Sequence, residues 1–137
     1  MEKFKFLEHT ADVKFQAFGK SLGEVFENCA LAMFNAMYED KIKEVKEFKI
    51  KAEGKDFESL LYNFLEEFLV LLDSENFFLS RVKSIKVDEK NLKVEAVIVG
   101  DDAESYKIPL DVKAITYNDM FVKREGDKWV AQVVLDV

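Results

Sequence analysis

The order of helical and alternating segments constrains the fold of this chain more than any other feature. Residues 22–38 and 57–72 carry apolar side chains at the spacing of amphipathic helices. Ser21, with Glu24 three residues on, and Asp56 are suitable N-caps for these helices. Every later segment shows the alternation of a strand. Because the helices are not interleaved regularly with strands, the sequence predicts an α+β fold with a mostly antiparallel sheet.

The expected order of elements is β-β-α-β-α-β-β-β-β-β within a single domain covering residues 1–137, since no linker or composition shift divides the chain. The predicted strands span residues 3–8, 11–19, 47–53, 77–88, 92–99, 106–115, 116–123 and 128–137. Pro109 favours an edge position for its strand, because proline cannot donate a ladder hydrogen bond. The final strand is apolar on both faces, which predicts a central position in its sheet.

Charge and cysteine content exclude several classes of function. The formal net charge is -7, and the lysines alternate with acidic residues without forming a basic block. Strong binding to nucleic acid is therefore disfavoured, whereas a cation or a basic protein partner suits the charge. Cys29 is the single cysteine and cannot form an internal disulfide. No signal peptide, membrane-length apolar run or standard nucleotide or hydrolase motif is found, so a soluble cytoplasmic protein is expected.

Oxygen ligands are concentrated at the end of the last strand. The side chain of Asp136 lies next to the α-carboxylate of Val137. If Asp12 lies near them, three hard oxygen ligands converge, which suits a divalent cation. Calcium is the expected ion, with magnesium and manganese as alternatives. The competing interpretation is that Asp12 and Asp136 are ordinary solvated acids, since nothing local in the sequence brings them together.

Four further residues are candidates for a supporting role: Glu8, His9, Lys113 and Tyr117. His9 is the single histidine and would be the base of any catalytic triad, although no nucleophile motif accompanies it. Lys113 could face the acidic cluster, and Tyr117 could orient a ligand. The alternative is a structural histidine, a surface lysine and a strand aromatic.

Three segments together resemble the archease family. They are Glu8-His9-Thr10-Ala11-Asp12, Lys113-Ala114-Ile115-Thr116-Tyr117, and the C-terminal run that begins at Trp129 and ends Asp136-Val137. Their order and spacing match over essentially the whole chain. Asn118 departs from the pattern, because many relatives have a histidine after the Thr-Tyr pair.

The resemblance implies a small non-enzymatic accessory protein of tRNA splicing, built from strand-helix-strand-strand modules. Such a protein activates the RtcB-type RNA ligase by promoting its guanylylation with GTP and a divalent metal, and by supporting multiple turnover. The family's metal site would map onto Asp12, Asp136 and Val137. Catalytic residues are not expected in this chain, and direct contact with RNA would be weak or absent.

Two other functions remain as alternatives. One is a metal-dependent phosphatase or nuclease that uses Asp12, Asp136 and His9, with Lys113 stabilising charge. The other is a general chaperone-like module that binds clients through the wide apolar stripe of the second helix, which requires an exposed apolar patch.

Overall fold

The computed structural model describes residues 1–8 and 11–137. Its elements follow the chain as β1 (Phe4–Leu7), β2 (Val13–Gly19), α1 (Leu22–Met37), β3 (Lys46–Glu53), α2 (Phe57–Glu75), β4 (Phe77–Asp88), β5 (Lys93–Asp102), the 3-10 helix η1 (Ala103–Ser105), β6 (Ala114–Glu125) and β7 (Lys128–Asp136). Every strand pairing that the described residues form is antiparallel, which confirms the predicted α+β class.

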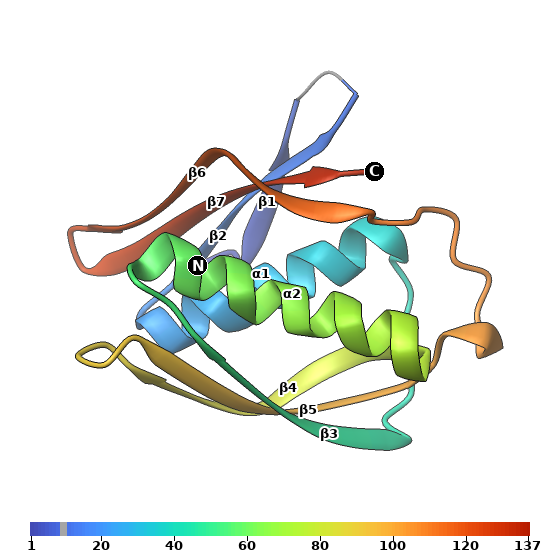
Figure 1. Cartoon of the computed structure of the whole chain (residues 1–137). Helices are drawn as coiled ribbons and strands as arrows, with labels where there is room; N and C mark the ends of the chain where they lie inside the picture. Colours follow the sequence, from blue (N-terminus) through green and yellow to red (C-terminus); the bar gives the residue numbers. More distant parts are fainter. Residues whose placement is uncertain (9–10) are drawn as a thin grey trace.

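The strands form two sheets with both α-helices between them (Figure 1). One sheet has the order β1-β2-β7-β6, and the other has the order β3-β5-β4. α1 contacts β2 and β7 on one side and β4 on the other, while α2 contacts β6 and β3. β3, α2, β4 and β5 follow one another as a strand-helix-strand-strand unit. The core therefore lies between the sheets, around the helices.

The wide apolar stripe of α2 is explained by this position. Its fully buried side chains are Leu60, Leu61, Phe64, Leu65 and Phe68. The helix begins at a capping box in which Asp56 accepts from the Ser59 backbone and the Ser59 hydroxyl accepts from the Asp56 backbone. These side chains are enclosed between the sheets, whereas Leu69, Leu71 and Leu72 near the C-terminal end of the stripe are half-buried.

β7 lies between β2 and β6, as its two apolar faces predicted. Val133 and Val134 have opposite orientations on this strand, and both are fully buried. The predicted hairpins also form: β4 joins β5 through residues 89–92, and β6 joins β7 through Gly126 and Asp127. Gly126 has a φ of 65°, a conformation that glycine adopts without steric cost.

The strand predicted for residues 106–115 is wrong. Residues 106–113 are irregular in the structure, and β6 extends from Ala114 to Glu125 with an interruption of its pairing between Thr116 and Phe121. The physical reason is the topology, because β5 and β6 belong to different sheets and the connection must cross between them. Pro109 suits this irregular connection, since it has no N–H to donate.

Tyr106 anchors the start of this connection. Its hydroxyl donates to Asp101 Oδ2 at 2.7 Å and accepts from the Lys43 backbone N–H at 3.0 Å. The hydrogen bond from Tyr106, together with one from the Asp102 backbone, holds the pKa of Asp101 below its usual value. The ionised carboxylate therefore stabilises the folded state above about pH 4, and this contribution is lost as the pH falls.

Tyr106→Phe is expected to lower the free energy of unfolding, and the loss should depend on pH. The difference from wild type should be largest between about pH 5 and pH 7, where Asp101 is ionised in both the folded and the unfolded chain. The difference should shrink below about pH 4, where Asp101 is protonated. The smaller loss of the hydrogen bond from the Lys43 N–H then remains. Urea unfolding midpoints measured from pH 2 to pH 7 provide the check. A difference that stays constant over this range would contradict the role given to Asp101.

None of the helices in the described part of the chain is both long and apolar enough to cross a membrane.

Candidate functional site

The pairing of β2 with β7 brings the predicted oxygen ligands to one end of a sheet. The register runs from Gly19 opposite Trp129 to Val13 opposite Leu135 without interruption. Asp12 directly precedes Val13 and Asp136 directly follows Leu135, so both aspartates lie at the same end of this pairing. Asp136 is the last residue of β7 and is exposed, and Val137 follows it. Residues that are far apart in the sequence are therefore neighbours in the fold.

Asp12 differs in one respect from its predicted position. It was expected on the polar face of the second strand, but β2 begins at Val13 and Asp12 lies in the bend before it. Ala11 has a φ of 69°, so the chain leaves the extended conformation here. The half-buried Asp12 therefore lies just before β2 and is not part of the ladder of β2 with β7.

A third segment reaches the same end of the sheet from the other side of β7. Ala114 pairs with Asp136, and the Lys113 backbone N–H donates to the Asp136 carbonyl at 2.8 Å. Lys113 thus lies next to Val137, and its side chain is exposed. The pairing of β6 with β7 therefore places the backbone of Lys113 next to that of Asp136.

The other supporting residues have different positions. Glu8 is exposed directly after β1, whereas His9 lies outside the described residues. Tyr117 stacks on Tyr62 of α2, with ring centroids 4.4 Å apart and an interplanar angle of 10°. Burial, helped by the nearby Tyr62, raises the pKa of Tyr117. This contact directs the tyrosine toward α2.

Asn118 lies in an irregular part of β6. Thr116 pairs with Val134 and Phe121 with Gln132, so four residues of β6 face one residue of β7. The Thr116 hydroxyl donates to the Val134 carbonyl at 3.0 Å and accepts from the Asn118 backbone at 3.3 Å. Asn118 itself is exposed on the bulge.

Sequence reasoning missed a polar network that fastens this bulge to the sheet. Gln132 donates to the Asp119 carbonyl at 2.8 Å and accepts from Gln16 at 2.9 Å. Lys14 Nζ lies 3.5 Å from Asp119 Oδ2. The available signal was Gln132, a polar residue in an otherwise apolar strand that the structure buries to 8 % exposure. Such a residue requires a hydrogen-bond partner.

The donor set at the sheet end suits a hard divalent cation in chemistry. Asp12, Asp136 and the carboxylate of Val137 offer oxygen atoms, which calcium and magnesium prefer. Within residues 1–8 and 11–137, no group of three or more histidine, cysteine, aspartate or glutamate side chains is arranged to hold a metal ion. Calcium takes six to eight oxygen ligands, so the remaining ligands of a bound ion would come from water or from a partner.

The fold defines a small antiparallel α+β protein in which strands from both ends of the chain pair, with Asp12 and Asp136 at the same end of that pairing. The model of the archease protein family matches residues 4–137, and the chain therefore belongs to the archease family. It is 39% identical over 140 residues to an archease of Sulfurisphaera tokodaii, covering 100% of both chains.

Solved structures agree with this fold. A Methanobacterium thermoautotrophicum protein of known solution structure is 34% identical to this chain, with a TM-score of 0.84 and 100% of each chain covered. A Thermotoga maritima crystal structure, described as an archease and a possible chaperone, is 23% identical, with a TM-score of 0.62 over 97% of this chain and 96% of that one. The latter supports the fold alone.

Proposed function

We propose that this protein is a non-enzymatic activator of an RtcB-type RNA ligase in tRNA splicing and acts in the cytoplasm. It promotes guanylylation of the ligase with GTP and a divalent metal, and it supports repeated turnover. Membership of the archease family supports this proposal. The observation that carries it is the uninterrupted register of β2 and β7, which brings Asp12 and Asp136 to the same sheet end.

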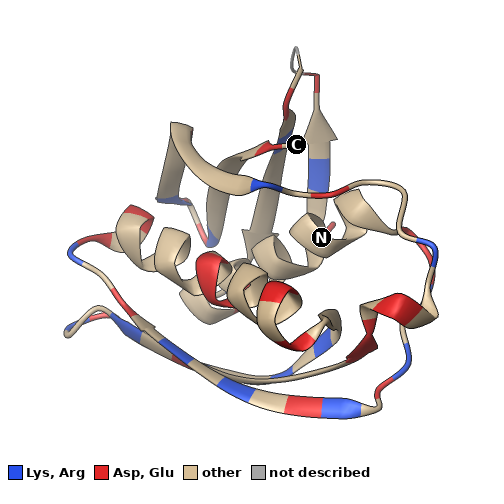
Figure 2. Cartoon of the chain, turned by 45° about the vertical axis from the view of Figure 1, so that its right-hand side comes forward, with Lys and Arg blue, Asp and Glu red and all other residues tan. Residues whose placement is uncertain are grey.

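The electrostatics of the chain suit a partner of this kind. The net charge is -7, so a basic, metal-loaded active-site entrance would attract the protein. Figure 2 shows basic and acidic positions mixed along the β3-β5-β4 sheet, and some of them form ion pairs, as Arg81–Glu44 at 3.0 Å and Lys83–Glu47 at 3.0 Å do. Pairing of this kind weakens the case for direct RNA binding.

In the proposed mechanism, Asp12, Asp136 and the Val137 carboxylate hold a divalent ion, with calcium expected and magnesium or manganese as alternatives. A bound ion would supply positive charge to the phosphates of the nucleotide. The Lys113 N–H donates to the Asp136 carbonyl at 2.8 Å, which holds the backbone at the end of β7 in place. The end of β7 and the bend that precedes β2 would then enter the ligase active site.

The test is a guanylylation assay with the purified ligase of the same source, GTP and metal, with and without this protein. Calcium, magnesium and manganese are compared, with EDTA as the metal-free control. Strong stimulation by substoichiometric protein supports the activator role. If a ligase that is competent alone shows no stimulation, the proposal is wrong. Metal-dependent phosphate release by this protein alone would instead support the phosphatase or nuclease alternative.

A further inference from the structure

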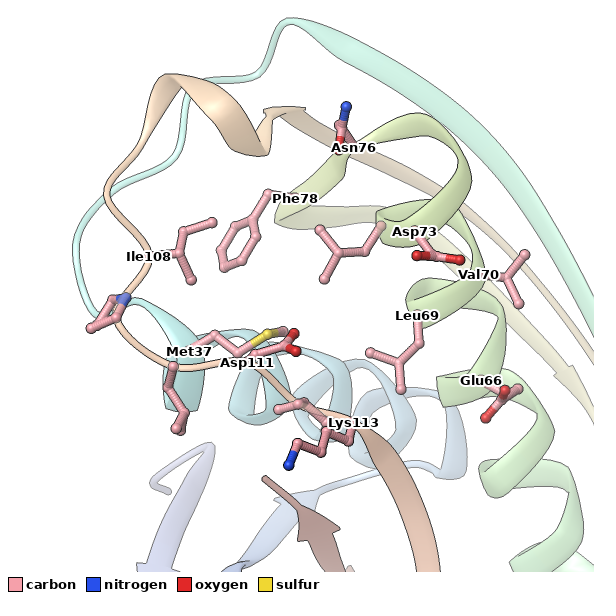
Figure 3. Close-up of a pocket in the computed structure, with 14 residues that line it drawn as sticks. Met37, Glu66, Leu69, Val70, Asp73, Asn76, Phe78, Ile108, Asp111 and Lys113 are labelled. Atoms are coloured by element: carbon pink, nitrogen blue, oxygen red, sulfur yellow. The ribbon is translucent and has the colours of Figure 1, made fainter.

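A groove of about 790 Å³ opens beside the candidate site, between the C-terminal ends of α1 and α2 and the irregular segment 107–113 (Figure 3). Its volume falls within the range of about 300–1,000 Å³ that is usual for ligand pockets. Lys113 is one of its lining residues, and the same residue donates its backbone N–H to Asp136. A molecule bound at the Lys113 end of the groove would therefore lie close to the end of β7.

The lining of the groove is mixed, with apolar side chains among polar ones. Met37 and Phe78 lie behind this lining at 1% exposure each, so they support the groove without offering surface to a ligand. Ile108 and Leu110, from the irregular segment, are half-buried on the opposite side. Val70 at the rim is 48% exposed, a large apolar side chain without full cover. Such a surface favours a ligand with apolar side chains.

The rim of the groove is acidic. Glu66, Asp73 and Asp111 line it, against Lys113 as the one basic lining residue in the described chain (Figure 3). These side chains are exposed, so they remain solvated until a partner binds.

The ends of the helices add to this negative potential. Met37 is the last residue of α1, and Asn76 is the C-cap of α2; both line the groove. Neither helix has a basic residue in its last turn. A helix C-terminus carries partial negative charge and carbonyl groups without helical partners, and both features favour a bound cation.

We propose that this groove is the docking site for a segment of a protein partner that carries lysine or arginine next to apolar side chains. Val70, Ile108 and Leu110 would take the apolar side chains, and the acidic rim and helix ends would take the cations. A nucleic acid does not suit the groove, because its phosphates would be repelled. The inference rests on the proposed function only for the identity of the partner, which is the RNA ligase. Its segment would be held near the candidate metal site.

The test compares matched charge reversals in the whole protein. The groove variant carries Asp73→Lys and Asp111→Lys, and the control carries Glu125→Lys and Asp127→Lys in the exposed β6–β7 turn, with the same change in net charge. Val70→Gln removes apolar contact without changing charge. Circular dichroism melting curves establish that each variant is folded, and light scattering shows whether any is dimeric.

Binding is measured by calorimetry with the purified ligase in EDTA without GTP, and by fluorescence anisotropy with a labelled peptide of alternating leucine and lysine. The groove variant should raise both Kd values at least tenfold and Val70→Gln severalfold, while the control changes them less than twofold. At saturating concentration the groove variant should still stimulate guanylylation fully, because the sheet end is intact.

Equal effects of groove and control variants on both probes would overturn the groove as a docking site, while leaving the activator role intact if wild type still stimulates. Loss of peptide binding in the groove variant, with no binding of wild type to the ligase, would support the groove but overturn the ligase as its partner. A wild-type dimer that the groove variant dissociates would show that a second copy occupies the groove, which would also overturn the proposal.

Discussion

Asp136→Ala should reduce guanylylation of the RNA ligase to the rate measured without this protein, and the melting temperature should remain close to that of wild type. Asp136 is exposed at the end of β7, so removing its carboxylate takes away no core packing. Its backbone bond from Lys113 is unaffected by the substitution. The loss concerns one of three proposed oxygen ligands, and the remaining two are too few to hold a hard cation in place.

Asp12→Ala should have the same effect, and Asp127→Ala in the β6–β7 turn is the matched control. A chain with one glycine appended after Val137 tests the third ligand, since the terminal carboxylate then moves by about 3.3 Å. Single-turnover rates of guanylylation at several metal concentrations provide the measurement. If Asp12→Ala and Asp136→Ala both stimulate like wild type, the sheet end is not the working surface.

Phe64→Ala should lower the free energy of unfolding by about 3–5 kcal/mol, the usual cost of deleting a buried phenylalanine. Phe64 is fully buried on α2, with its ring 5.6 Å from that of Phe26 and 5.0 Å from that of Phe68. Because α2 is packed between the two sheets, the surrounding groups have little room to collapse into the cavity. A fall in melting temperature of about 10–20 °C is expected for a domain of this size.

Urea unfolding followed by circular dichroism measures this loss. Val70→Ala on the same helix is the control, because Val70 is 48% exposed, and its cost should stay within about 0.5 kcal/mol. A loss of less than about 1 kcal/mol for Phe64→Ala would show that the core repacks around the vacated volume, contrary to this account.

Local patterns in the sequence were sufficient to predict the helices and hairpins. Ser21 and Asp56 cap α1 and α2 as expected, because capping is decided by residues within one turn. Residues 106–115 were assigned wrongly because Ile108, Leu110 and Val112 alternate like a strand although they line a crossing between sheets. The division of strands into two sheets depends on contacts between distant segments, which periodicity does not encode.

The candidate site illustrates the same limit. The oxygen ligands were proposed from their residue types, yet the sequence offered no reason for Asp12 and Asp136 to meet. The reason is the β2–β7 register, which is fixed by the burial of Phe15 opposite Val133 and of Ala17 opposite Ala131. A slip of one residue would turn these side chains to the opposite face of the sheet. The groove was not anticipated, because it is formed by helix ends and an irregular segment.

The position of β7 between β2 and β6 has a consequence for how the molecule folds. Gln16 and Gln132 are paired although 116 residues separate them, so this sheet forms only after most of the chain has been brought together. Until then β1 and β2 form a bare hairpin, which is marginally stable at best. Non-local pairing of this kind slows folding and leaves strand edges open to other chains. During synthesis one edge of β2 therefore stays unpaired until β7 has been made. We expect the protein to be most vulnerable to aggregation in this interval.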